Sequence, residues 1–509
     1  MPLSRRAGSF LLCLAGAALF WAPWLSGARV PFYDTLLRLF YPAAEVLRRA
    51  LARGEFPFWD PFRYSGLPYL ADPQHAVLYP PTLLYALLPF ARAMPLDLCL
   101  HTALAAFGML LWAEDLGASA PAAALAAAAF ALNGYAVGRY AYPSNVHAYA
   151  WAPLVLLWAG RAGRSGSLRD AATAALLLSV QAFAGFPQTS LLTLAAAGAV
   201  WAAYGGRKAS QAALVILGSA AASAAQWVPT LLAVASSARV GMGASAVTAY
   251  SLSPHELLRM LVLPLWDRFR APAGGDPHIL GFYAGLPVLL LAALAPAGER
   301  PALRRALGAL AAAGLLLSLG SFLPGSGLLF ALPPLRWLRF PPQYLFLTAL
   351  CLPPLAAAGC GRLAGGRRGA GWALAALCAA DLFLFGRGWV ESLDASVYAA
   401  EPPTASWLAA RDDGRRVFMT PRTRAIRGRR GRTRLEAWLR FKDSLTPDVA
   451  AGAGLRDADG VSDLRTGRYQ AVLDALSSSP LSPWMDALSV RWLLTLGSLP
   501  PPRFRLARA

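Results

Sequence analysis

The sequence predicts an all-α polytopic membrane bundle of about 11 transmembrane helices, followed by a small C-terminal extracytoplasmic α/β domain. Three observations lead to this prediction. Hydrophobic residues make up 57% of the 509 positions and charged residues only 15%, whereas a soluble domain usually carries about 25% charged residues. Apolar runs near the bilayer-crossing length of about 20 residues recur up to residue 389. Beyond that point, polar turns and short candidate strands replace them.

The charge balance favours a membrane protein over a nucleic-acid-binding protein. There are 47 basic and 27 acidic residues, a net charge of +20, and every basic residue except Lys208 and Lys442 is arginine. A basic excess is also typical of nucleic-acid-binding proteins. In a chain with a mean hydropathy of +0.45, we interpret it as loop charge that orients the helices. The five cysteines lie in apolar stretches without a CxxC pair, so they predict neither disulfides nor a zinc site.

The first apolar run, residues 8–28, follows Arg5 and Arg6 and is long enough for one span. The Ser-Gly-Ala at 26–28 is similar to a signal-peptidase site, so cleavage is the alternative to a retained anchor. We favour the anchor because the run is longer than the apolar core of a signal peptide. Either way, residues 29–94 form a long outer loop. Within this loop, residues 36–53 predict an amphipathic helix that lies along the membrane surface. Residues 79–90 predict a segment that dips into the membrane.

Ten further apolar segments predict the remaining spans: 95–113, 119–138, 148–160, 170–186, 188–204, 211–235, 279–296, 303–320, 342–361 and 370–388. Arginine and lysine gather in alternate loops, at 161–169, 205–208, 297–305 and 362–368. The positive-inside rule therefore places these loops and the N-terminus in the cytoplasm. The first loop, the turns 139–147 and 186–188, the stretches 236–278 and 321–341 and the tail then share the outer face.

The tail gives the second part of the predicted organisation. We expect a multi-pass transmembrane domain over 1–389 and an extracytoplasmic domain over 390–509, with strands at 416–420 and 490–496. The tail is too short for more than one modest core. Its arginine-rich run at 422–434 predicts a solvated face, with contact to an anionic polymer or lipid phosphate as the alternative.

Asp34 is the first candidate catalytic residue. It lies just after the first span, beside Phe32 and Tyr33, where partial burial would suit a general base. The alternative is a helix N-cap before Leu36, because aspartate is a preferred cap residue. Position alone leaves the two interpretations even.

The segment 57–81 is the second candidate region, because it holds polar side chains among prolines and aromatic residues. Such a composition builds a rigid irregular surface rather than a helix. It fits a pocket wall that holds a sugar by stacking and hydrogen bonding. The alternative is a structured loop that covers the bundle. The candidate substrate-binding residues here are Trp59, Asp60, Arg63, Tyr64, Asp72, Gln74, His75 and Tyr79.

Four more candidates lie in the outer turns. His147 and Gln188 lie in two of them, and Arg336 and Arg339 stand where the chain re-enters the membrane. Arginine there either binds phosphate through its two-pronged guanidinium or extends to lipid headgroups. The five histidines are too scattered to predict a metal site. No P-loop, GxGxxG, HExxH or GxSxG motif is present, so a transferase of this kind would take its donor from the membrane.

Several segments in order resemble the YfhO-type bacterial membrane proteins. They include GEFPFWDPFRYSGLPYLADPQHAVLYPP (54–81), LHTALAAFGMLLWAEDLGAS (100–119), FALNGYAVGR (130–139), AWAPLVLLW (150–158), GFPQ (185–188), LRFPP (338–342), ADLFLFG (380–386), and GVSDLRTGRYQAVLDAL with MDALSVRWLLT in the tail. This family is similar to the GT-C class of glycosyltransferases. The resemblance implies a polyprenyl-phosphate-linked sugar donor and an acidic residue of the first outer loop acting as base or metal ligand. Asp34 matches that position.

The sequence differs from the family pattern at three places. Many such enzymes carry two adjacent acids in this loop, but here the next acid after Asp34 is Glu45. The cofactor is therefore left open: a divalent metal is possible, although no clear ligand cluster supports it. Phe186 and Gln343 stand where relatives often have histidine and arginine.

The favoured function is transfer of a sugar from a polyprenyl-phosphate donor to a cell-envelope polymer or lipid, on the outer face of the cell membrane. Asp34 would deprotonate the acceptor, Arg336 and Arg339 would neutralise the departing phosphate, and Trp59, Tyr64 and Tyr79 would line the sugar site. The expected partners are the bilayer, the donor and the acceptor, without nucleic acid. The alternative is a non-catalytic multi-pass protein, either a transporter or an envelope scaffold. It is disfavoured because polar groups gather at one face rather than near the bilayer midplane.

Overall fold

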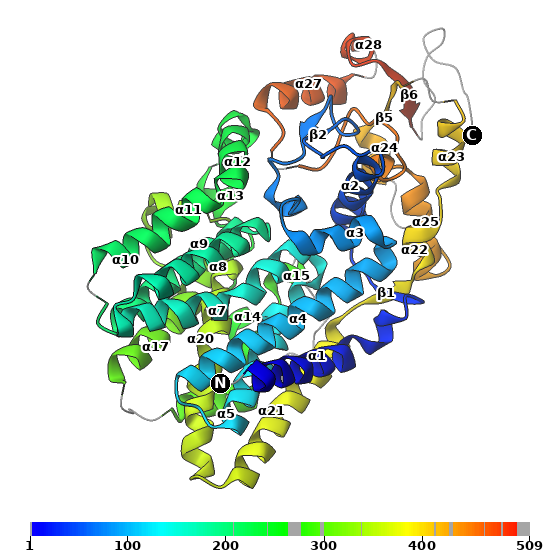
Figure 1. Cartoon of the computed structure of the whole chain (residues 1–509). Coiled ribbons are helices and arrows are strands. Elements are labelled where there is room, and N and C mark those ends of the chain that lie inside the picture. The colour runs from blue at the N-terminus through cyan, green and yellow to red at the C-terminus, as the bar shows by residue number, and fades with distance from the viewer. Residues whose placement is uncertain are drawn as a thin grey trace.

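The fold is mostly helical, with a bundle of long helices at one end and the first loop and tail at the other (Figure 1). The structure is a computed structural model that describes residues 3–206, 208–241, 243–262, 276–295, 300–336, 338–411, 414–426, 431–462, 464–479 and 482–495. The bundle contains α1 (Leu3–Leu25), α4 (Phe90–Asp115), α5 (Ala120–Ala131), α6 (Gly134–Gly138), α7 (Pro143–Ser165), α8 (Leu168–Phe183), α9 (Pro187–Ala203), α10 (Ala209–Ala213), α11 (Ser219–Ala222), α12 (Ala224–Ser236), α16 (Leu286–Ala293), α17 (Pro301–Ser318), α20 (Leu345–Ala364) and α21 (Arg368–Trp389).

A helix is present in each of the eleven segments that the sequence predicts to span the membrane. Among the described residues, five helices are long and apolar enough to cross a bilayer: Arg6–Leu25, Phe90–Asp115, Ala120–Ala141, Pro341–Ala364 and Arg368–Trp389. The pair Ala209–Ala222 and Ala224–Ser236, bent by 74°, adds a sixth if it counts as one span. The chain is therefore a multi-pass membrane protein, and the number of eleven spans stays a prediction.

Small residues let the long helices pack closely. A Cβ atom placed on Gly359 of α20 would lie 1.8 Å from the backbone oxygen of Leu291 in α16, so only glycine fits there. The turn between α7 and α8 depends on Gly166, whose φ of +67° lies in the left-handed region that favours glycine. Ser167 is the N-cap of α8, because its hydroxyl accepts a hydrogen bond from the backbone N–H of Asp170.

The basic loops lie together at one end of the bundle. Arg161 and Arg164, at the end of α7, both pair with Asp115 at the end of α4. Lys208 donates to the Gly166 carbonyl at 3.0 Å, and Arg300 contacts the Tyr204 hydroxyl at 3.3 Å. Loops that the positive-inside rule assigns to one side are thus neighbours in space. Which side of a membrane they face stays a prediction.

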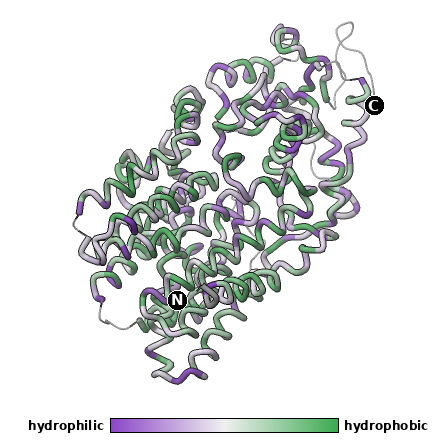
Figure 2. The backbone as a smooth tube through the Cα atoms, in the orientation of Figure 1, coloured by the Kyte–Doolittle hydropathy of each residue, from purple (hydrophilic) through white to green (hydrophobic). Residues whose placement is uncertain are grey.

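The first loop and the tail meet at the opposite end. Strand β1 (Arg29–Pro31) pairs antiparallel with β4 (Ser392–Asp394), and Val30 and Phe32 share a hydrophobic cluster with Leu393, Val397 and Trp438. In the tail, α22 is Ser396–Ala399, α23 is Pro403–Ala409, α24 is Pro421–Ile426, α25 is Arg434–Asp443, α26 is Val449–Gly452, α27 is Gly467–Ser478 and α28 is Trp484–Ala487. Figure 2 shows mostly hydrophobic helices in the bundle and more hydrophilic chain where the first loop meets the tail.

The two predicted tail strands are present as β5 (Arg416–Met419) and β6 (Val490–Leu494), which pair in parallel. Their cluster includes residues of the first loop: Tyr64 and Leu67 pack with Phe418, Leu473 and Met485. The tail core is therefore completed by the first loop. A separate C-terminal domain stays a prediction.

The first loop is built from short elements. The predicted helix over 36–53 is present as the π-helical turn η1 (Leu36–Phe40) followed by α2 (Tyr41–Ala52). A hairpin follows, with β2 (Trp59–Asp60) against β3 (Leu67–Pro68). The loop ends in η2 (Pro73–His75), η3 (Pro80–Leu83) and α3 (Leu84–Leu87). Placement of these segments on or in the membrane surface stays a prediction.

Candidate functional site

Asp34 stands at the start of the first loop, between β1 and η1. Its side chain is 24% exposed and forms an ion pair with Arg38, one helical turn later, at 3.3 Å. The neighbouring Tyr33 packs its ring against the His278 imidazole, with the centroids 4.0 Å apart. The Tyr33 carbonyl accepts the first backbone N–H groups of the helix, those of Leu36 and Leu37. Asp34 is thus held in place and still reaches solvent.

An open pocket has Tyr33, the residue before Asp34, in its wall. The tail supplies the rest of the lining: Glu391, Gly431, Arg432, Thr433, Arg434, Ala437 and Trp438. Arg434 pairs with Glu391 and keeps half of its side chain exposed. The arginine-rich run of the tail therefore ends beside the first loop, where cations and aromatic rings line one opening.

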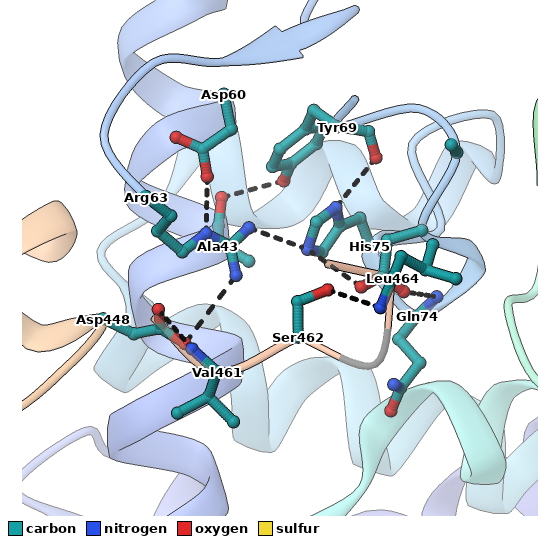
Figure 3. Close-up of polar contacts among 12 residues, drawn as sticks. Ala43, Asp60, Arg63, Tyr69, Gln74, His75, Asp448, Val461, Ser462 and Leu464 are labelled. Carbon is teal, nitrogen blue, oxygen red and sulfur yellow. Dashed lines mark hydrogen bonds and ion pairs between the residues drawn. The ribbon is translucent and has the colours of Figure 1, made fainter. Parts of the chain in front are cut away.

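Arg63 is the centre of a buried polar network in the first loop (Figure 3). Its Nε donates to Asp60 Oδ2 at 2.6 Å, and its Nη2 lies 3.2 Å from His75 Nε2. Its Nη1 lies 3.8 Å from Oδ2 of Asp448, which comes from the tail. Burial alone would lower the pKa of Arg63, but Asp60 and Asp448 raise it above its ordinary value, so the guanidinium stays charged.

His75 completes this network from the other side. Its Nδ1 donates to the Tyr69 carbonyl at 2.9 Å and its ring stacks on Tyr69. Burial lowers the pKa of His75, although the carboxylate of Asp72 opposes the shift. A neutral ring with its proton on Nδ1 leaves Nε2 free to accept from Arg63.

Two further predicted residues lie next to His75. Asp72 caps η2 by accepting the backbone N–H of Gln74 at 3.0 Å. Gln74 and His75 line a small pocket together with His147. Six of the predicted residues, Asp60, Arg63, Asp72, Gln74, His75 and His147, are thus connected.

Asp448 was not among the predicted residues, yet it is one of the most unusual carboxylates in the structure. It is fully buried, adopts a left-handed backbone conformation with φ of +75°, and accepts the Val461 N–H at 3.0 Å. Burial raises the pKa of Asp448 to about 7, against the opposing effect of Arg63. Arg38 also acts on this carboxylate, so the Asp34–Arg38 pair lies near the Arg63 network.

The three aromatic residues expected to line a sugar site do not converge. Trp59 is 54% exposed, and its indole covers Gly66 across the hairpin. Tyr64 is buried in the tail cluster, where its hydroxyl accepts the Ser462 N–H at 3.1 Å. Tyr79 lies in another cluster and contacts His101 and Trp151. Their assignment to one sugar site stays a prediction that the geometry does not favour.

Arg339 and Gln188 do lie together. The Gln188 amide donates to the Arg339 carbonyl at 3.0 Å, and the Arg339 guanidinium lies 4.6 Å from the Phe340 ring centroid. Arg336, at the end of α19 (Pro333–Arg336), is exposed. Gln343 is buried and accepts hydrogen bonds from Tyr135 and Asn145.

Sequence reasoning missed a second buried cluster, formed by Asp97, His101 and His147. Only His147 was predicted. An aspartate and a histidine four residues apart inside an apolar helix were the available signal, because ionisable groups inside a span rarely lack a function. The ligand atoms of this cluster lie within 4.8 Å of one another, so these three residues are able to hold a metal ion.

No family model matches the chain, and no curated protein matches its sequence. Among solved structures, it is similar to the cryo-EM structure of the arabinofuranosyltransferase AftD from Mycobacteria, with a TM-score of 0.53, 19% identity and 83% of this chain covered. The chain spans only 30% of that protein. The crystal structure of ArnT from Cupriavidus metallidurans, bound to undecaprenyl phosphate, matches with a TM-score of 0.48 and 14% identity, over 88% of this chain and 90% of that one.

The likeness to AftD is a likeness of fold. It includes 83% of this chain. At 19% identity it transfers no substrate and no residue role. This multi-pass membrane chain therefore shares its fold with part of the arabinofuranosyltransferase AftD.

Proposed function

We propose that the protein is a membrane glycosyltransferase that moves a sugar from a polyprenyl-phosphate donor to a cell-envelope polymer or lipid, with Asp34 as the catalytic base. One observation carries the proposal. Asp34 is a partly exposed carboxylate in the first loop of a chain that shares its fold with part of AftD, and the residue before it lines an open pocket. The donor, the acceptor and the outer-face location are parts of the proposal.

The chemistry requires a base next to the acceptor hydroxyl. A carboxylate that removes this proton makes the oxygen a better nucleophile toward the anomeric carbon, and such catalysis contributes about 10²–10⁴ in rate. Arg38 holds Asp34 by an ion pair at 3.3 Å. A fixed base saves the entropy of orienting it in each turnover.

The pocket next to Tyr33 has the composition of a site for an anionic envelope-polymer acceptor. Tyr33 and Trp438 provide aromatic surface and Arg432 and Arg434 provide cations. Guanidinium groups bind phosphate with two parallel hydrogen bonds, and aromatic faces cover the apolar side of a sugar ring. In this proposal Arg434 is shared between Glu391 and the substrate.

Arg336 and Arg339 are proposed to bind the departing lipid phosphate. The Gln188 contact with the Arg339 carbonyl holds the backbone at this point, and the planar guanidinium loses less entropy per hydrogen bond formed than a lysine ammonium does. The absence of a nucleotide-binding motif in the sequence and the resemblance to YfhO-type proteins support a lipid-linked donor.

The test is sugar transfer by the purified full-length protein from a labelled polyprenyl-phosphate sugar. We expect Asp34→Asn to fold normally, judged by its thermal midpoint in detergent, and to lose about 10²–10⁴ in rate. Asp115→Asn is the matched control, because Asp115 also pairs with arginine but lies at the other end of the bundle. It should keep full activity.

Two outcomes would overturn the proposal. If the Asp34→Asn protein is stable and fully active, Asp34 is not the catalytic base. The wild-type protein can also be tested with a panel of envelope acceptors. If it is folded but turns over no polyprenyl-phosphate sugar, the glycosyltransferase assignment is wrong and the non-catalytic alternative is favoured.

A further inference from the structure

A carboxylate and two imidazoles converge inside the bundle, near the end that carries the first loop. Asp97 and His101 are one turn apart on α4, and His147 lies in the second turn of α7. His147 Nε2 is 2.6 Å from Asp97 Oδ2, and His101 Nδ1 is 3.0 Å from Asp97 Oδ1. All three side chains are buried. From this geometry we propose that Asp97, His101, His147 and Tyr79 bind one divalent ion of the zinc class as a structural metal site.

The hydrogen bonds of His101 assign its ligand atom. Its Nδ1 faces two acceptors of Asp97, the main-chain carbonyl at 2.8 Å and the carboxylate. Nδ1 therefore carries the proton, and Nε2 presents its lone pair. A hydrogen bond from the ring to a carbonyl is the usual way in which a protein orients a metal-binding histidine.

Tyr79 supplies the fourth ligand. Its hydroxyl oxygen lies 2.8 Å from His101 Nε2 and accepts the indole N–H of Trp151 at 2.8 Å. Tyr85 donates in the same way to Asp97 Oδ2 at 2.7 Å. These outer hydrogen bonds hold the two oxygen ligands in place.

The charge of the cluster favours a cation. In the part of the chain that the structure describes, no arginine or lysine pairs with Asp97; its partners are Tyr85 and the two imidazoles. A buried carboxylate is costly unless it is paired or binds a metal. Two imidazole nitrogens and a carboxylate are ligands that zinc takes in proteins, and in this proposal the Tyr79 oxygen is the fourth ligand.

The distances between the ligand atoms fit the replacement of their shared protons by a metal ion. Protons now join the ligand atoms in pairs at 2.6 and 2.8 Å. A tetrahedral ion with bonds of about 2.0–2.1 Å places its ligand atoms about 3.3 Å apart, so each pair must separate by roughly half an ångström or more. On metal binding, Tyr79 would lose its hydroxyl proton and His147 would carry its ring proton on Nδ1 instead of Nε2. A small pocket has His147 in its wall.

Four protein ligands leave no open coordination position, so the ion would be structural rather than catalytic. It would join α4, α7 and, through Tyr79, the first loop. The proposal is independent of Asp34 and of sugar transfer.

The test is metal analysis of the full-length protein, purified in detergent without chelator, by mass spectrometry. We expect about one zinc-class ion per chain, and less than a tenth of that in Asp97→Asn and in His147→Gln. After chelation, added Zn²⁺ should raise the thermal midpoint of the wild type and leave both variants unchanged. Thr102→Val is the control, because Thr102 is buried beside His101 and bonds Trp21; it should keep the ion.

Tyr79→Phe keeps the ring and removes one ligand atom, so it remains informative if another variant fails to fold. We expect it to fold and to bind Zn²⁺ at least tenfold more weakly. Two results would overturn the proposal: wild-type protein that neither contains a stoichiometric metal nor gains thermal stability with Zn²⁺, or metal that persists unchanged in Asp97→Asn and Tyr79→Phe.

Discussion

Arg63 of the first loop and Asp448 of the tail face each other inside the protein, with Nη1 and Oδ2 3.8 Å apart and neither side chain more than 1% exposed. Asp60 pairs with the same guanidinium at 2.6 Å. A backbone hydrogen bond also joins the first loop to the tail here, because the Asp457 N–H donates to the Phe62 carbonyl at 2.7 Å. The pocket beside Tyr33 is bounded by the same two parts of the chain, so its shape depends on how they join.

Replacing Arg63 should disturb this junction strongly. Arg63→Met keeps most of the volume but leaves the buried Asp60 carboxylate without its cation. Breaking a buried ion pair from one side costs about 3–5 kcal/mol. The measurement is the free energy of unfolding in a reversible detergent titration. Arg53→Met is the control, since its ion pair with Glu55 is more than half exposed and should contribute at most about 1 kcal/mol.

Asp448 should make the stability depend on pH. Its pKa is about 7 in the folded protein and 3.8 in its ordinary state, so the folded protein binds more protons between these values. Stability then falls as pH rises from about 4 to about 7. Asp448→Asn cannot ionise and should flatten that part of the profile. A variant that loses as much stability as the wild type between these pH values would contradict the assignment.

The helices could be predicted because their signal is local. Apolar runs of sufficient length form helices wherever the backbone must satisfy its own hydrogen bonds, and a helix is present in every predicted segment. The strands β5 and β6 were also predicted from short apolar runs. The parallel pairing of β5 with β6 and the antiparallel pairing of β1 with β4 join distant parts of the sequence. No local pattern specifies such partners.

The candidate site was predictable to the same limited degree. Asp60, Arg63 and His75 come together because one proline-rich loop carries all three. Asp448 could not be paired with Arg63 from sequence, because a long-range ion pair has no spacing rule. Tyr64 and Tyr79 were expected to share a site, but burial places their rings in separate clusters. Aromatic content alone does not say which rings face a pocket.

The contact between α20 and α16 gives a prediction with an internal control. Gly359→Ala places a methyl group 1.8 Å from the Leu291 carbonyl oxygen, so the helices must separate, at a typical cost of about 1–3 kcal/mol. Gly361, on the same helix, has nothing within 4 Å of an added Cβ. Gly361→Ala should instead stabilise slightly, by up to about 1 kcal/mol through helix propensity. The measurement is the thermal midpoint of each variant in one detergent. We expect a lower midpoint for Gly359→Ala and a slightly higher one for Gly361→Ala; equal shifts would contradict the close contact between α20 and α16.

The clustering of basic loops predicts the orientation in the membrane. Arg161, Arg164 and Lys208 lie at one end of the bundle, and the tail lies at the other. The positive-inside rule then places the tail outside the cytoplasm. A reporter that is active only in the cytoplasm should give no signal after Ala509 and a strong signal in the loop after Gly166. The reverse pattern would contradict this orientation and the common outer face.

Arg339 tests whether the re-entry point binds donor phosphate. Its backbone is held by Gln188 and its guanidinium lies beside Phe340. Arg339→Lys keeps the positive charge but replaces a planar fork with a point charge, which cannot bind phosphate through two parallel hydrogen bonds. We expect an unchanged thermal midpoint and a KM for the lipid-linked donor raised roughly tenfold, since one charge-assisted hydrogen bond contributes about 1.5–3 kcal/mol.

Arg53→Lys, at an exposed arginine of the first loop, is the matched control and should leave KM unchanged. If Arg339→Lys binds donor as well as the wild type does, Arg339 serves as a headgroup anchor, for which lysine and arginine are equivalent.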